Sequence, residues 1–126
     1  MRYAGGELGG FVGAGIKIDQ TMATVKNSIL QYNKTNAILL VNSNSWIEAN
    51  QFLNNQSYNG SPDVSGVYMQ GGSPDIINSL FKENDYGIYM NVFGQDPASP
   101  NLDSNTFEGN IKDGIYDAYI PPGPPL

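Results

Sequence analysis

The sequence predicts an all-β solenoid, in which short parallel strands form coils that stack along one axis. A nine-residue block of the form apolar-x-x-(Asn/Ser)-x-(Leu/Phe)-x-x-Asn occurs four times. Each copy is accompanied by a shorter block, small-apolar-x-apolar, and both alternate apolar and polar residues with the period of a strand. The spacing varies only between blocks, which is where loops on a repetitive scaffold accept insertions. We therefore expect about five short coils.

The shorter block supplies the first strand of each coil, so coils are expected to start at residues 15, 37, 66, 87 and 114. Parallel strands of successive coils should pair at about 4.8 Å. The repeats then occupy residues 15–117. Residues 1–14 form either an irregular cap or the remnant of a preceding coil of a longer rod. The proline-rich residues 118–126 form a tail or a linker, since proline cannot donate to a strand ladder.

The apolar positions of both blocks should point into the coil and stack by type. The expected core residues are Ile16, Ile18, Val25, Leu30, Ile38, Leu40, Ile47, Phe52, Val67, Met69, Ile76, Phe81, Ile88, Met90, Leu102, Phe107 and Ile115. The closing asparagines Asn33, Asn55, Asn84 and Asn110 should form an internal ladder that satisfies corner backbone groups. Gly or Ala before each first strand suits a tight turn or a positive φ.

The pattern of Asn105-Thr106-Phe107-Glu108-Gly109-Asn110 followed by Gly114-Ile115-Tyr116 resembles the right-handed parallel β-helix repeat of the pectate-lyase-like superfamily. The same pattern occurs at Asn50–Asn55, and the resemblance spans residues 15–117. It implies a right-handed parallel β-helix of the kind found in bacterial surface proteins. It does not imply one activity, because such helices include lyases, hydrolases, adhesins and phage fibres. A leucine-rich repeat is the rival fold, but this chain is short of leucine and places Gly before its strand.

The composition narrows the possible functions. There are 12 Asp+Glu against 6 Lys+Arg, and neither His nor Cys is present. Disulfides and Cys-based zinc sites are therefore excluded, and we expect neither a metal nor a cofactor. A net charge of −6 argues against nucleic acid as a partner. No apolar stretch approaches the roughly 18 residues of a membrane span, so membrane insertion is not expected.

The outward position of the first strand is the best candidate for binding. Along the rod it holds Lys17, Leu39, Tyr68, Tyr89 and Tyr116. Tyr68, Tyr89 and Tyr116 would form an exposed aromatic strip on which sugar C–H faces can pack, and they are the predicted ligand-binding residues. The preferred interpretation of the row is nevertheless a tyrosine stack that only stabilises the sheet, because cross-strand aromatic pairing needs no ligand.

Catalysis would have to rely on carboxylates. Glycoside hydrolysis needs two that face one cleft about 5–10 Å apart. Asp75 and Asp96 follow the first strand in adjacent coils and could approach each other, while a lyase-like arrangement has only Lys17 and Asp19 on one strand. Solvated surface charges are the preferred interpretation of all four. No catalytic residue is predicted.

We therefore expect a non-catalytic structural or adhesive β-helix module of a secreted or cell-surface protein, with polysaccharide as the candidate partner. One alternative is a fragment of a polysaccharide lyase or glycoside hydrolase. Another is a fibre unit that assembles end to end. The insertions Gln56–Ser65 and Asn91–Asn101 are further recognition candidates, because loops on a rigid scaffold commonly carry binding.

Overall fold

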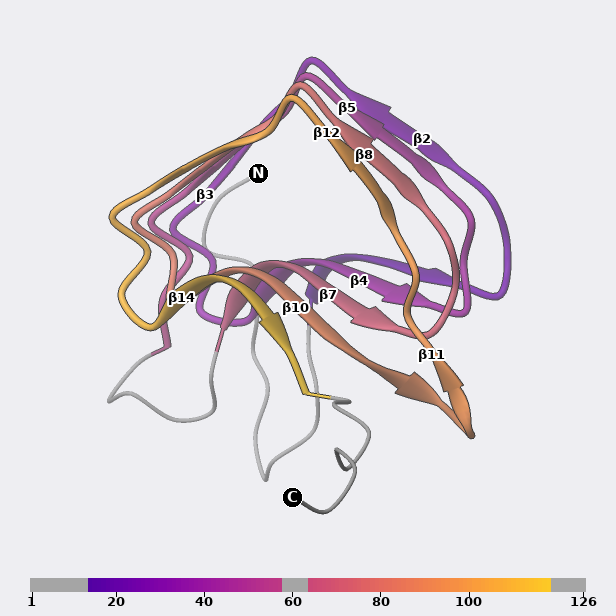
Figure 1. Cartoon of the computed structure of the whole chain (residues 1–126). Helices are drawn as coiled ribbons and strands as arrows, with labels where there is room; N and C mark the ends of the chain where they lie inside the picture. The colour runs from indigo at the N-terminus through magenta and orange to yellow at the C-terminus, as the bar shows by residue number, and fades with distance from the viewer. Residues whose placement is uncertain (1–13, 58–63, 119–126) are drawn as a thin grey trace.

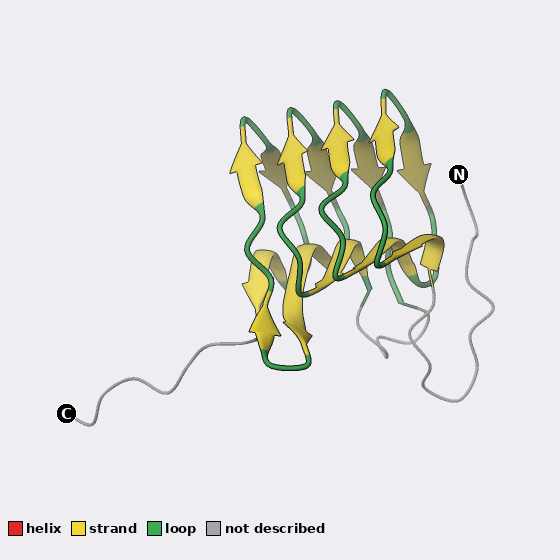
Figure 2. Cartoon of the chain, turned by 90° about the vertical axis from the view of Figure 1, so that its right-hand side faces the viewer, coloured by secondary structure: helices red, strands yellow, loops and turns green. Residues whose placement is uncertain are grey.

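A computed structural model describes residues 14–57 and 64–118, and every regular element among them is a strand. The chain winds through three parallel sheets in turn, so each coil contributes one strand to each sheet. Figure 1 shows the coil from one end, and Figure 2 shows the coils side by side. Four complete coils are present, and β14 (Asp113–Asp117) supplies the first strand of a fifth. The solenoid expected from the sequence is confirmed.

Each sheet collects one strand per coil. The first sheet contains β1 (Ala14–Asp19), β4 (Asn36–Val41), β7 (Ser65–Gln70), β10 (Tyr86–Phe93) and β14, with β11 (Asp96–Pro97) antiparallel to β10. The second sheet contains β2 (Thr24–Lys26), β5 (Trp46–Glu48), β8 (Asp75–Ile77) and β12 (Asn101–Asp103). The third sheet contains β3 (Ile29–Gln31), β6 (Gln51–Leu53), β9 (Leu80–Lys82) and β13 (Thr106–Glu108).

The core consists of columns of like residues, as the alternation predicts. All of the expected inward residues except Ile115 belong to the core cluster or pack against it. Phe52 and Phe81 stack with ring centroids 4.7 Å apart, and Phe81 and Phe107 at 5.1 Å. Ile115 is 38% exposed, because β14 is the outermost strand of the first sheet and pairs only with β10.

The closing asparagines form the predicted ladder between the third sheet and the next coil. The Nδ2 of Asn33 donates to Oδ1 of Asn55 at 2.8 Å, Asn55 to Asn84 at 2.8 Å, and Asn84 to Asn110 at 3.1 Å. Each of these acceptors also receives the backbone N–H of the preceding asparagine. From Asn55 onward, Nδ2 also donates back to a carbonyl of the preceding coil, and the first of these is that of Leu30. All of the side-chain amides thus point the same way.

A second polar column, which the sequence analysis did not predict, lies at the corner between the second and third sheets. It consists of Ser28, Asn50, Ser79 and Asn105. Each backbone N–H donates to the side-chain oxygen of the next member, at 3.0, 3.2 and 3.0 Å. Asn50 and Asn105 also donate to carbonyls of the preceding coil, at 2.8 Å each. The Asn/Ser position of the nine-residue block therefore has the same structural role as the closing asparagine.

Gly66 and Gly87, each the second residue of its strand, are required by lack of space and not by their φ angles. None of Gly66, Gly87 and Gly114 has a positive φ, so that part of the prediction is wrong. A Cβ on Gly66 would lie 3.0 Å from the Phe52 Cβ, and one on Gly87 would lie 2.5 Å from the Gly114 carbonyl oxygen. The phenylalanine stack and the neighbouring coil thus come too close for a side chain.

Positive φ occurs instead at the residue that follows a strand. Three rows contain these residues: Gln20, Asn42 and Gly71 after the first sheet; Asn27, Ala49, Asn78 and Ser104 after the second; Tyr32, Asn54, Glu83 and Gly109 after the third. The N–H of such a residue bonds a carbonyl of the next coil, as in Ala49 to Ile77 at 3.1 Å. The left-handed conformation costs a non-glycine residue about 1–2 kcal/mol, and this hydrogen bond helps to offset it.

One of the two insertions is described in full and the other only in part. Residues 91–101 extend β10 into a hairpin with β11, in which Phe93 pairs with Asp96. The other insertion includes residues 58–63, which lie outside the described residues. The carboxylate of buried Asp85 accepts the N–H groups of Ser57 at 2.9 Å and Val64 at 3.3 Å, so it fastens both flanks of that insertion to the next coil. The expected cap over 1–14 and the tail over 118–126 lie almost entirely outside the described residues.

Candidate functional site

The predicted tyrosine strip is in register on the first sheet. Tyr68, Tyr89 and Tyr116 pair in sequence along β7, β10 and β14. The rings of Tyr68 and Tyr89 stack at 4.9 Å with 6° between their planes, and those of Tyr89 and Tyr116 lie at 5.0 Å with a 38° tilt. Tyr86 joins them, edge-on to Tyr89 at 5.2 Å. Tyr86 was not among the predicted residues, because it precedes the short block.

The stacking determines what the strip presents to solvent. Tyr68 and Tyr89 cover each other's faces, so the row offers mainly ring edges and hydroxyls, and the Tyr68 hydroxyl already accepts a 3.2 Å bond from the Asn91 amide. Leu39, in the same row, is only 3% exposed, which corrects the expectation of an open outward position there. It is paired between Lys17 and Tyr68, whose side chains flank it on the same face. Of the three tyrosines, Tyr116 is the most exposed, at 40%, and it ends the row on the side of β14.

The second sheet carries a different row on its outer face. Thr24, Trp46, Asp75 and Asn101 pair in sequence along β2, β5, β8 and β12. Trp46 is 41% exposed, and its indole N–H donates to the Glu48 carboxylate at 2.9 Å. In the next two coils, the Asn101 amide donates to Asp75 Oδ1, also at 2.9 Å. An aromatic side chain and a carboxylate–amide pair thus lie on adjacent strands.

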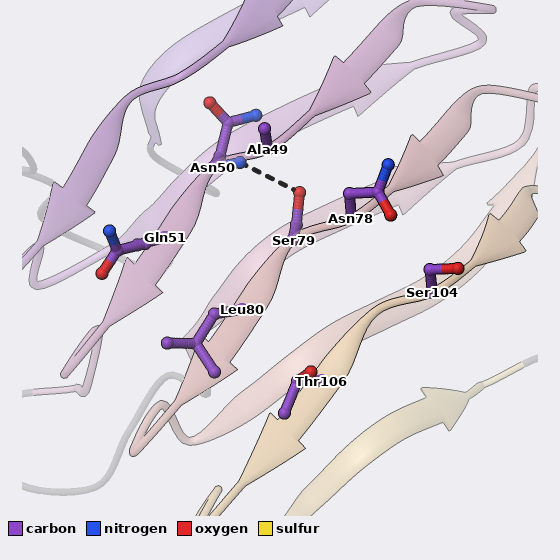
Figure 3. A pocket seen from close by; sticks show the side chains of 8 residues that line it. All are labelled: Ala49, Asn50, Gln51, Asn78, Ser79, Leu80, Ser104 and Thr106. Carbon is purple, nitrogen blue, oxygen red and sulfur yellow. Dashed lines mark hydrogen bonds between the residues drawn. The ribbon is translucent and has the colours of Figure 1, made fainter.

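A shallow hollow of about 460 Å³ lies over the corner between the second and third sheets (Figure 3). Three successive coils line it, through Ala49, Asn50, Gln51, Asn78, Ser79, Leu80, Ser104 and Thr106. All of these residues are uncharged. Asn50 and Ser79 are bonded to each other within the second polar column, so the hollow follows from small residues at a tight corner.

The carboxylates considered for catalysis are not brought into one cluster. Asp75 opens β8 in the second sheet, whereas Asp96 lies in the β10–β11 hairpin of the first sheet. Lys17 and Asp19 form a solvent-exposed ion pair with 3.8 Å between Nζ and Oδ2. Within residues 14–57 and 64–118, no group of three or more potential ligand side chains gathers for a metal ion. Nor do these residues form a helix long and apolar enough to cross a membrane.

Comparison of the sequence with models of protein families shows the family to which the chain belongs. A model described as the right handed beta helix region matches residues 9–119. The chain belongs to this family. Comparison with curated proteins and with solved structures gives no significant match. Membership in the right-handed β-helix family accounts for the columns and ladders of this β-helix, and any binding chemistry must be sought in side chains on its outer faces.

Proposed function

We propose that this β-helix is a non-catalytic structural and adhesive module of a secreted or surface protein, and that it binds polysaccharide along an outer face. The proposal depends chiefly on one observation: outward side chains repeat in straight rows, one per coil, across up to five coils. A polymer with its own regular repeat can contact such a row at several points. Repeated weak contacts then add up through multivalency.

The contacts of four described carboxylates support a binding function over a catalytic one. Asp85 holds two backbone amides, Asp75 accepts from an asparagine, and Glu48 orients an indole. Asp19 pairs with a lysine. Each of these carboxylates bonds another group of this chain, as carboxylates that stabilise a fold or form surface ion pairs ordinarily do.

A glycan array combined with a polysaccharide-degradation assay on the whole chain tests this function. Retention of a glycan without release of reducing or unsaturated products is the expected result. Product release would overturn the non-catalytic part of the proposal. Failure to retain any glycan at concentrations up to the millimolar range would overturn the adhesive part.

End-to-end assembly is a second candidate, favoured by the distribution of charge along the rod. The first coil, residues 14–35, carries three lysines and one aspartate, whereas residues 101–118 carry one lysine and four acidic residues. Among the described strands, β12 and β13 of the last complete coil are also edge strands, which present backbone groups for pairing. Opposite charges on the two end coils favour head-to-tail contact, which in an open geometry builds filaments.

Sedimentation velocity over a concentration series at low and high salt tests the assembly. Reversible growth that weakens as salt screens the charges is expected. A single monomeric boundary at all concentrations would refute it.

A further inference from the structure

We propose that the outer face of the second sheet around Trp46 is the site that binds a neutral polysaccharide, through the indole of Trp46 and the carboxylate–amide pair of Asp75 and Asn101. The inference deepens the proposed function, on which it rests. It assigns the contact to a face other than the tyrosine strip, and it specifies uncharged pyranose units as the ligand class.

The indole is held in one orientation before any ligand arrives. Its Nε1–H donates to Glu48 Oε1 at 2.9 Å on the same strand, two residues away. With its N–H satisfied, the side chain still exposes 41% of its surface. An aromatic side chain fixed in this way loses little conformational entropy on binding, and a pyranose C–H face can pack against it.

The adjacent strands supply hydrogen-bond acceptors. Asp75 pairs with Trp46 in the strand register, and Asn101 pairs with Asp75. The Asn101 Nδ2 donates to Asp75 Oδ1 at 2.9 Å, and this bond uses neither Asp75 Oδ2 nor Asn101 Oδ1 as an acceptor. Sugar hydroxyls are donors, and bonds to a carboxylate are about twice as strong as those between neutral groups. The spacing of neighbouring strands places Asp75 about 4.8 Å from Trp46, and Asn101 about twice that distance from it.

Charge on this face determines which glycans are accepted. The second sheet carries three acidic residues: Glu48 on β5, Asp75 on β8 and Asp103 on β12. Among the described strands of this sheet, the one basic residue is Lys26 on β2, which pairs with Glu48. A uronate polymer would place its carboxylates against these side chains and be repelled. Neutral chains avoid this repulsion, so the face should discriminate by charge.

The other two surfaces fit the ligand less well. In the tyrosine strip, Tyr68 and Tyr89 cover each other's ring faces, so most of the stacking surface is already used. The hollow over the corner has amides and hydroxyls but no aromatic side chain. Only the second sheet combines an exposed indole with unused acceptors among the described residues.

The single tryptophan makes the test direct, because all tryptophan emission comes from Trp46. We expect a neutral oligosaccharide found on the array to change that emission with a saturable dependence on concentration, whereas a uronate polymer leaves it unchanged. Isothermal calorimetry should show roughly tenfold or greater weakening for Trp46→Ala and for Asp75→Ala, equivalent to about 1.4 kcal/mol or more. Tyr116→Ala, which removes an equally exposed aromatic side chain from the first sheet, tests the tyrosine strip as the competing site and should bind as the wild type does.

The possible outcomes separate the two proposals. Glycan retention with unaltered Trp46 emission, or with full affinity in Trp46→Ala, would overturn this site and leave the adhesive function standing. Loss of affinity in Tyr116→Ala alone would transfer the site to the tyrosine strip. Equal binding of uronate polymers would overturn the charge selection. Circular dichroism and urea unfolding of each variant identify any loss of affinity caused by misfolding. If Asp75→Ala does not fold, Asp75→Asn, which keeps the shape of the side chain, replaces it.

Discussion

Removal of one central rung of the asparagine ladder should destabilise the fold strongly. In Asn55→Ala, four side-chain hydrogen bonds are lost: two accepted from Asn33, one donated to the Leu30 carbonyl and one donated to Asn84. Asn33, Asn55 and Asn84 are all completely buried. The backbone N–H and one side-chain N–H of Asn33 are therefore left without an acceptor.

The magnitude follows from these two orphaned donors. Each buried unsatisfied group costs about 1–3 kcal/mol, so the free energy of unfolding should fall by about 2–6 kcal/mol. That is a large fraction of the roughly 5–15 kcal/mol that stabilises a typical domain. Urea unfolding followed by circular dichroism measures the change as a lower midpoint at unchanged m-value.

Asn110→Ala is the matched control for Asn55→Ala. It also removes an acceptor of two donors, those of Asn84, but Asn110 is only partly buried and water can replace its oxygen. A loss of about 1 kcal/mol is expected there. If Asn55→Ala lowers stability by no more than Asn110→Ala does, the ladder is not held by buried hydrogen bonds and the reasoning fails.

Three further substitutions test other contacts of the fold. Gly87→Ala should lower the free energy of unfolding by about 1–3 kcal/mol, because its Cβ would lie 2.9 Å from the Phe107 ring; wild-type stability in urea would contradict the close approach. Phe81→Ala, which leaves a gap in the aromatic stack, should lower it by about 3–5 kcal/mol, with a reduced thermal midpoint as the measure. Asp85→Ala should speed hydrogen exchange at the Ser57 amide with little change in the central coils, and unchanged exchange there would show that the carboxylate does not fasten the insertion.

The columns could be predicted because the sequence repeats with the period of the coil. Apolar residues such as Ile47 and Ile76 recur at the same place in each block, and strand alternation fixes the face to which they point. The closing asparagines recur with the same spacing, so the asparagine ladder could be predicted as well. Ile115 departs because burial at the outermost strand depends on neighbours that a periodic pattern does not represent.

The corners were harder to predict, because their residues do not repeat in type. Gln20, Tyr32 and Glu83 all adopt positive φ, and none belongs to the residue types that favour it. What they share is an N–H that bonds a carbonyl of the next coil, which is visible only in three dimensions. The glycines were misassigned for a related reason, since the sequence does not show how near the ring of Phe107 lies to Gly87.

The candidate site was predicted only in part. The register of Tyr68, Tyr89 and Tyr116 followed from the repeat, but the mutual covering of the rings did not. The row that contains Trp46 and Asp75 was not predicted, because the residue type at this position differs from one copy of the repeat to the next. A signal did exist: both residues directly precede the inward isoleucine of the second strand.

The uniform direction of the asparagine amides gives the rod unequal ends. When the last complete coil frays, two N–H groups of Asn84 lose their acceptor, the Asn110 oxygen. When the first coil frays, one N–H group of Asn55 loses its acceptor, the Leu30 carbonyl, and the Asn55 side-chain oxygen loses the N–H groups that it accepted from Asn33. Bare donors are penalised more than spare lone pairs. Melting should accordingly be vectorial, with the first coil peeling away more readily than the last, so a pulling force would meet a different resistance at each end.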